Sequence, residues 1–143
     1  MEEIYELRKA LEEHRYADAF ILIEEMEEMS REDKINKIDS YAVILLLHLI
    51  KQEAEHRTTR SWDLSVYHAV RRTKRTNKRR KVGGVYLSSL ELQKIIAEAY
   101  PPALKMAALE TFEGQYTEDQ LAKQVNRETI EQRALDEILS ESD

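Results

Sequence analysis

Eight of the eleven residues from Arg71 to Lys81 are Lys or Arg, in a chain whose formal net charge is -6. Guanidinium and ammonium groups pair with phosphates and carboxylates, so the chemistry that this segment offers is anion recognition. The local charge from Arg57 to Lys81 is +9, which leaves -15 on the rest of the chain. A helix built on the segment has no apolar face, and nothing between Val70 and Val82 is predicted to be buried. The segment is therefore predicted to project into solvent or to lie across a partner.

Three partners for this basic segment stay open. Acidic helices of the same chain or of a second copy could neutralise it, or an acidic protein could dock there. Nucleic acid is the runner-up, with phosphates along the cations and bases stacked on Tyr67 or Tyr86. The glycines Gly83 and Gly84 are compatible with a helix end or with a protruding hairpin. The predicted binding residues are Arg71, Arg72, Lys74, Arg75, Lys78, Arg79, Arg80, Lys81 and Trp62.

Motifs for catalysis and metal binding are sparse. Glu53 and His56 form the one Glu-x-x-His of the chain, whereas a di-iron centre in a helical bundle needs two such motifs and two further Glu residues. Arg8 and His14 have a spacing that also occurs in helical ribonucleases, but chance produces it easily in a charged helix. The sequence has no Cys, which excludes disulfides and cysteine nucleophiles. We predict no metal and no cofactor, and the scarcity of such motifs favours a non-catalytic protein over an enzyme.

The composition predicts one all-α domain. The chain has 143 residues, with only 3 Gly and 2 Pro and with 35% charged residues, a texture typical of helices. The absence of Cys fits a cytoplasmic location, and the acidic amino terminus is unlike a signal peptide. The apolar run from Tyr41 to Ile50 would span about 15 Å as a helix, half the thickness of a bilayer core. It is predicted to be a core helix, and no membrane partner is expected.

Helical periodicity places the elements of the first half. The first helix is predicted to end between His14 and Tyr16. The apolar stripe of the second helix changes phase near Ser30, where an N-cap followed by acidic residues predicts a break or kink. The run from Tyr41 to Ile50 is hydrophobic all round, so the other helices are expected to wrap it at the centre of the fold.

Capping signals place the elements of the second half. Ser61 is predicted to cap the helix that leads into the basic segment. Ser88 has the capping-box spacing with Glu91, and Thr117 has it with Gln120. Pro101 and Pro102 predict a new helix start that bends away from the segment before it. Residues 115–143 are predicted to form two short helices with an acidic end, as an extension of the bundle formed by residues 1–114.

The order "LIEEMEEM", "LLLHLIK", "RSW" and "EAYPPALKMAALETFEG" resembles the mainly bacterial family named domain of unknown function 29. The segments "TNKRRKVGGVYL" and "DQLAKQVNRETIEQRALDEIL" resemble its cyanobacterial members, so the resemblance covers nearly the whole chain. It implies a helical bundle of uncharacterised function and supplies no reaction. It also implies that recurrent polar and aromatic positions of the family fall on Glu24, Glu25, His48, Lys51, Ser61 and Trp62.

His48 stands inside the apolar run, where a neutral imidazole needs both a hydrogen-bond donor and an acceptor. Glu24 or Glu25 from the preceding helix could serve, either as a catalytic dyad or as a structural hydrogen bond, and the structural interpretation is favoured. Lys51 is predicted to extend its ammonium group to solvent. Trp62 is interpreted first as an anchor of the bundle and second as a platform for a stacked ligand.

These observations predict an all-α bundle of about five principal helices with a helical carboxy-terminal extension. The predicted function is a non-catalytic interaction or regulatory module in which a basic arm, residues 71–81, binds a protein partner or a second copy. A nucleic-acid-binding or antitoxin-like regulator is the alternative, and an enzyme with a Glu/His dyad is the second alternative.

Overall fold

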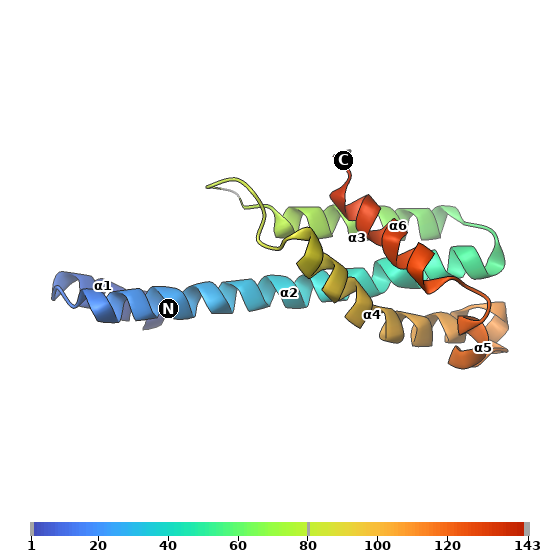
Figure 1. Ribbon diagram of the computed structural model, residues 1–143, viewed down its shortest axis with the longest axis horizontal. Helices are drawn as coiled ribbons and strands as arrows, with labels where there is room; N and C mark the ends of the chain where they lie inside the picture. Colours follow the sequence, from blue (N-terminus) through green and yellow to red (C-terminus); the bar gives the residue numbers. More distant parts are fainter. Residues whose placement is uncertain (1, 80, 142–143) are drawn as a thin grey trace. The chain divides into compact units, whose positions relative to one another are not determined.

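The computed structural model describes residues 2–79 and 81–141, and this part of the chain is all-α, as predicted (Figure 1). Five of its α-helices have eleven residues or more, which confirms the predicted bundle of about five principal helices. The elements in chain order are α1 (Glu2–Glu12), α2 (Tyr16–Glu55), α3 (Arg60–Asn77), α4 (Ser89–Glu110), the 3₁₀ helix η1 (Phe112–Gly114), α5 (Glu118–Ala122) and α6 (Arg127–Leu139).

The chain divides into two compact units, unit 1 (Met1–Ile35) and unit 2 (Asn36–Asp143). Unit 1 holds α1 and the first half of α2, joined by a turn in which His14 has a φ of 60°. Within the described part of unit 1, Ala10 and Ala19 are the buried apolar side chains. This unit therefore packs through small side chains and has a thin core.

The predicted break near Ser30 is wrong, because α2 continues without interruption from Tyr16 to Glu55. The segment has neither Gly nor Pro, and one Ser costs a helix interior only a few tenths of a kcal/mol, about 0.5. The apolar stripe changes phase for another reason: Met26 is partly buried in unit 1, whereas Ile38 and Leu45 are buried in unit 2. The phase shift therefore marks a change of packing partner along one helix.

The core of unit 2 is centred on the second half of α2, as predicted. Leu45, Leu46 and Ile50 are 0% exposed, and Leu92 and Ile96 of α4 are nearly as buried. The prediction that this helix is wrapped on every side is wrong, since Ile44 is 40% exposed. The helices that pack against α2 leave one strip of it open, and an apolar residue there is tolerated because single exposed apolar side chains cost little.

The start of α3 is capped by Thr59, not by Ser61 as predicted. The Thr59 hydroxyl accepts a hydrogen bond from the backbone N–H of Trp62 at 3.1 Å, and the helix begins at Arg60. Both residues are suited to the role. The choice falls on Thr59 because its backbone is extended, with φ -127° and ψ 163°, whereas Ser61 already has a helical hydrogen-bond pattern.

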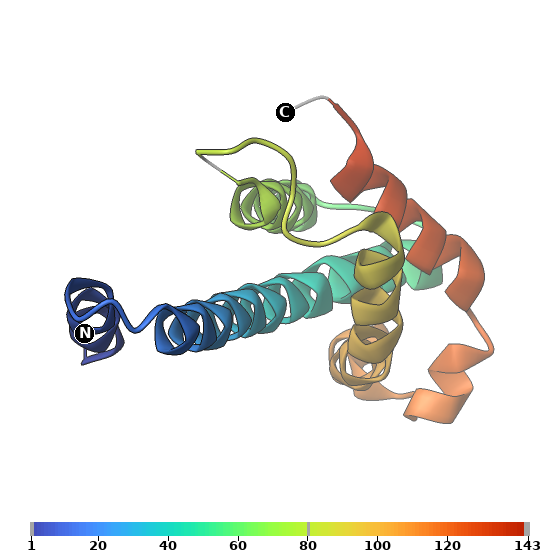
Figure 2. The same cartoon turned by 60° about the vertical axis from the view of Figure 1, so that its left-hand side comes forward.

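In α4 the predicted capping box is confirmed, with Ser88 and Glu91 each accepting the other's backbone N–H. The prediction of a new helix at Pro101 and Pro102 is wrong in one respect, because both prolines lie inside a single helix. The predicted bend is present: Figures 1 and 2 both show α4 changing direction midway along its length. Two consecutive missing N–H groups weaken the backbone ladder at this point, which bends the helix without ending it.

The carboxy-terminal helices begin at clear caps. The predicted capping box of Thr117 and Gln120 is confirmed, and Asn126 caps α6. Helix α6 packs against α3 and α4, as Figure 2 shows, and its buried side chains are Ile130, Ala134, Leu135 and Ile138. Its described residues therefore add apolar surface to the core of unit 2. A domain boundary at residue 114 stays a prediction.

Tyr100 is the buried phenol beneath α6, with the Arg127 guanidinium 4.6 Å from its ring centroid. Burial raises its pKa from 10.0 to about 12. The phenolate is thus less favoured in the folded chain than in the unfolded one, so stability falls as the pH rises from about 10 towards 12.

We expect the melting temperature of Tyr100→Phe to fall less than that of the wild type between about pH 9 and pH 11.5, because the variant has no phenol to ionise at this position. Circular dichroism melts at both pH values test this, and equal losses in the two proteins would contradict it.

Candidate basic binding face

The basic residues of the predicted arm divide between two structural settings. Arg71, Arg72 and Arg75 are exposed on α3, whereas Lys78 and later residues lie in the loop between α3 and α4 (Figure 1). We call the exposed cations of the described residues the basic face: Arg71, Arg72, Arg75, Lys78, Arg79 and Lys81. The predicted binding residue Arg80 lies outside the described residues.

The opposite side of this segment is buried, which the sequence did not predict. Thr73 is 0% exposed and Asn77 5% exposed, in line with Ala69 one turn earlier. The prediction that nothing between Val70 and Val82 is buried is therefore wrong. Spacing i, i+4, i+8 puts these three residues on one helical face. The sequence did contain a signal for this buried face, because short uncharged side chains recur at that spacing among the long cationic ones.

Asn77 ties the loop after α3 to the start of α4. Its side-chain amide donates to Leu87 O at 3.2 Å, and its Oδ1 accepts from Leu87 N–H at 2.8 Å. Lys78 and Val85 form an antiparallel bridge, and Gly83 and Gly84 have φ of 75° and 76°. The sequence left open a helix end or a hairpin at the two glycines, and the structure has both: α3 ends at Asn77, and a short hairpin-like loop follows. The described residues of this loop are held by these contacts and can present Lys78, Arg79 and Lys81 in a preferred arrangement.

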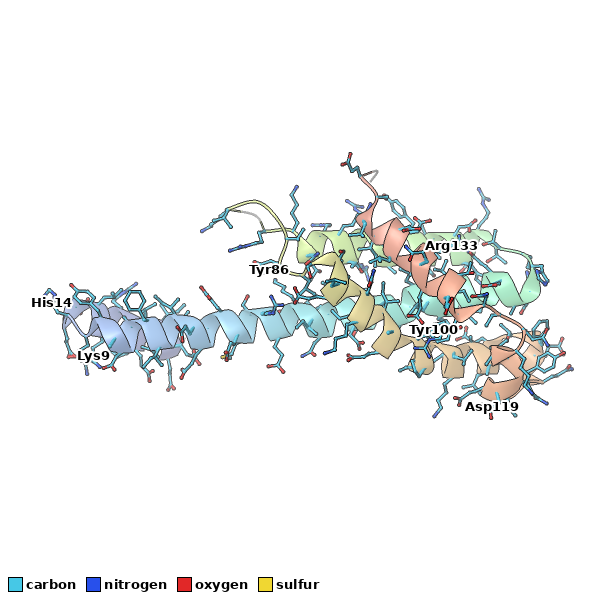
Figure 3. All side chains as sticks on the ribbon, in the orientation of Figure 1. Lys9, His14, Tyr86, Tyr100, Asp119 and Arg133 are labelled. Carbon is cyan, nitrogen blue, oxygen red and sulfur yellow. The ribbon has the colours of Figure 1, made fainter. Side chains whose placement is uncertain are left out.

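The basic face has no carboxylate partner within the described residues: no Asp or Glu oxygen lies within 4.0 Å of its cationic nitrogens. The contact of Arg79 is with an aromatic ring, since its guanidinium carbon is 5.8 Å from the ring centroid of Tyr86. Figure 3 labels Tyr86 beside the loop, from which long side chains extend outwards. Neutralisation by α6, the acidic helix of the same unit, is thus not found in the described residues.

Lys74 differs from its cationic neighbours. Its ammonium group donates to the backbone O of Ser140 at 2.8 Å and to its hydroxyl oxygen at 3.0 Å. Ser140 is the C-cap of α6, and a cation there satisfies carbonyl groups at the negative end of the helix dipole. Lys74 therefore fixes the end of α6 beside α3.

A groove of about 390 Å³ runs between these two helices. Its α3 wall consists of Val66, Tyr67, Val70, Arg71, Lys74 and Arg75, and its α6 wall of Glu137 and Ser140. Tyr67 is 46% exposed and Val70 is 8% exposed. The groove therefore combines an accessible aromatic ring and an apolar floor with cations of the basic face. Sequence reasoning found Tyr67 and the cations and missed Glu137 and Ser140, which only the packing of α6 brings to this place.

Lys51 and Trp62 lie elsewhere in unit 2. Lys51 is 6% exposed, its ammonium group is 2.9 Å from Glu110 Oε1, and it lies 4.7 Å from the Trp62 ring centroid. Arg57 is also 4.7 Å from that centroid. The prediction that Lys51 extends to solvent is wrong, because pairing with Glu110 compensates the burial of its charge. Trp62 already contacts two cations of its own chain, which favours its interpretation as an anchor.

His48 makes its hydrogen bond within α2. Its Nδ1 lies 2.8 Å from the backbone O of Ile44, so the Nδ1–H donates to that carbonyl. Glu24 and Glu25 are exposed and belong to unit 1, whereas His48 belongs to unit 2. Within the described residues no carboxylate hydrogen-bonds to the imidazole. The Glu/His dyad stays a prediction.

In residues 2–79 and 81–141, no group of three His, Asp or Glu side chains lies close enough together to hold a metal ion. Glu53 of the Glu-x-x-His pair instead accepts a hydrogen bond from the Asn126 N–H at 3.2 Å, and His56 is exposed. Among the described helices, none combines the length and the apolar character that crossing a bilayer requires.

Comparison with known proteins agrees with the resemblance in the sequence. The model of the family described as "Domain of unknown function DUF29" matches residues 2–139. No curated protein and no solved structure gave a significant match. The resemblance to cyanobacterial members of the family stays a prediction.

Proposed function

Because the chain belongs to the DUF29 family, whose description names no reaction, we propose from its geometry a non-catalytic interaction or regulatory module. Its basic face binds an acidic protein surface. One observation carries the proposal: the cations of this face are exposed and make no ion pair within the described residues. Closely spaced unpaired cations repel one another, and an acidic partner relieves that repulsion.

The elements beneath the basic face support this function. Arg71, Arg72 and Arg75 stand on a helix whose other side is buried through Thr73 and Asn77. The loop cations follow a backbone held by the Asn77–Leu87 hydrogen bonds. A rigid support lowers the entropy lost on binding, so the cations can meet a carboxylate pattern at lower cost than a flexible tail.

A triple variant tests the proposal. We expect Arg72→Gln/Lys78→Gln/Lys81→Gln to bind a polyglutamate peptide about tenfold more weakly than the wild type, because three exposed pairs contribute about 0.5 kcal/mol each. Fluorescence anisotropy of the labelled peptide at low salt measures the affinity. Wild-type binding should also weaken as ionic strength rises, since exposed charges are screened.

The matched control is Lys94→Gln/Lys123→Gln/Arg133→Gln, which removes the same charge from three exposed residues outside the basic face. We expect it to change the affinity by less than about twofold. Equal weakening by both triples would mean that net charge alone attracts the peptide. That outcome, or no binding by the wild type at low salt, would refute the proposal.

A second copy of the chain is one source of acidic surface. Residues 2–35 hold twelve Asp and Glu and five Lys and Arg, so unit 1 has the charge sign that the basic face attracts. Sedimentation velocity of the full chain in low and high salt tests self-association. A dimer that dissociates with salt and is weakened in the Arg72/Lys78/Lys81 variant would identify the partner as a second copy.

Nucleic acid is the second candidate, and the aromatic rings beside the cations favour it. Tyr67 is 46% exposed next to Arg71, and Tyr86 lies beside Arg79, an arrangement in which bases can stack while phosphates pair with cations. Binding of generic RNA and of a DNA duplex, measured across a salt series, distinguishes between the two partners. A log-log slope of about -4 or steeper that becomes shallower by about 2.7 in the triple variant, because each removed cation contributes about 0.9, would favour nucleic acid over an acidic protein.

A further inference from the structure

The groove between α3 and α6 has a graded chemistry along α3. Two adjacent rows of side chains line it at i, i+4, i+8 spacing: Val66, Val70, Lys74 and Tyr67, Arg71, Arg75. Each row covers about 12 Å of helix axis. Along both rows the apolar or aromatic residues come first and the cations last, so one end of the groove is apolar and the other is cationic.

The apolar end suits a planar ring. Tyr67 is 46% exposed, which leaves part of its ring accessible, and Val70, which lines the same groove, is 8% exposed. Aromatic rings gain by stacking on such a surface, and the stacking does not depend on one ring system. A ligand with a planar group could cover Tyr67 and exclude water from Val66 and Val70.

The cationic end suits a phosphate. Arg71 and Arg75 are one turn apart on one face, so their guanidinium groups can reach the same anion, and each can donate two parallel hydrogen bonds. Neither has a carboxylate partner within the described residues. Lys74 lines the same groove, and its hydrogen bonds to Ser140 join α3 to the end of α6. The anion would replace no existing ion pair of the arginines.

Glu137 of α6 is half-buried and is the carboxylate among the groove-lining residues of the described chain. Beside three cations it leaves the groove with a positive balance, and it offers an acceptor for a ligand N–H. A molecule with a phosphate, a planar ring and an amino group therefore matches the groove. The volume of about 390 Å³ is within the range of small-molecule sites.

We propose that this groove binds a mononucleotide, with the phosphate on Arg71 and Arg75, the base on Tyr67 and a base amino group towards Glu137. The proposal does not rest on the proposed function. The triple variant of that function changes Arg72, Lys78 and Lys81, none of which lines the groove. Either proposal can therefore fail while the other stands.

Isothermal titration with AMP, adenosine and inorganic phosphate tests the site on the full chain. We expect AMP to bind at least about tenfold more tightly than either fragment, because only AMP engages both ends of the groove. Amide resonances of Val66, Val70 and Ser140 should shift on titration with AMP, which locates the ligand. Equal affinity for AMP and inorganic phosphate would overturn the proposal, as would the absence of AMP binding at millimolar concentration.

Single variants with a matched control complete the test. We expect Arg71→Gln and Arg75→Gln each to weaken AMP binding about tenfold, and Tyr67→Ala about five- to tenfold. Arg72→Gln removes an equal charge from a neighbouring exposed position outside the groove and should change the affinity less than about twofold. Circular dichroism melts of every variant verify the fold. If Arg72→Gln weakened AMP binding as much as Arg71→Gln, the ligand would lie on the general basic surface and the groove proposal would be wrong.

Discussion

Leu46→Ala is expected to lower the free energy of unfolding by about 2–5 kcal/mol, the largest loss from any single change considered for this chain. Leu46 is 0% exposed in the second half of α2, around which unit 2 is built. Shortening the side chain removes buried apolar area and leaves a cavity that well-packed neighbours fill only in part. Urea denaturation followed by circular dichroism at 222 nm measures the change.

Ile44→Ala is the matched control for this prediction. Ile44 lies two residues earlier on the same helix, is 40% exposed, and loses a similar number of methyl and methylene groups. Its replacement should cost less than about 1 kcal/mol, because little of the lost area is withdrawn from water. Comparable losses at the two positions would mean that the exposed strip of α2 is covered in solution, by a second copy or by another partner.

Asn77→Ala is expected to cost about 2–4 kcal/mol and to loosen the loop that carries Lys78, Arg79 and Lys81. The change removes both side-chain hydrogen bonds to Leu87 and leaves a buried N–H and a buried carbonyl without their partners. Leu87 itself is 1% exposed, so water cannot replace these bonds without opening the structure. Amide hydrogen exchange of Leu87 should accelerate, in addition to the loss of stability in urea.

Thr73→Ala is the control for Asn77→Ala, because it removes a buried polar group without removing the hydrogen bonds that hold the loop. Thr73 is 0% exposed and its hydroxyl donates to Ala69 O at 2.8 Å, within its own helix. Its replacement should cost about 1–2 kcal/mol. Exchange at Leu87 should follow only the global change in stability, with no local opening. If both variants accelerated Leu87 exchange to the same extent relative to their stability, Asn77 would not be what holds the loop.

The helix caps illustrate what local sequence can predict. Ser88 with Glu91 and Thr117 with Gln120 were predicted from spacing and are present, because a capping box depends on four consecutive residues and little else. Where two neighbouring residues were both suited to the role, as at Thr59 and Ser61, the sequence did not decide. The backbone path that enters α3 selected Thr59.

Ser30 and Pro101 illustrate the opposite case. The change of stripe phase near Ser30 looked like a break because periodicity reports which side of a helix is buried. A continuous helix that belongs to two units can change its buried side without ending. At Pro101 the bend was predicted and the new helix start was not found. Buried neighbours such as Ala99, Tyr100 and Ala103 hold both halves of α4 against the core, which keeps the helix continuous.

The candidate site divides in the same way. Arg71, Arg75 and Tyr67 were named from the sequence, since their charge, aromaticity and i, i+4 spacing are local properties. Glu137 and Ser140 are more than sixty residues away along the chain, and no local pattern links them to Arg71. They line the groove only because the apolar side of α6 packs on α3 and α4.

By itself, the sequence of this protein determined the all-α class, the membership of its family, two capping boxes and the position of its cations. These depend on composition, on short-range hydrogen bonds and on side-chain spacing within a few turns. Only the tertiary structure decided that Asn77 and Thr73 are buried, that Lys51 pairs with Glu110 and that α6 closes a groove beside Tyr67. Each of these depends on which apolar faces meet, and that is settled by packing among segments far apart in the chain.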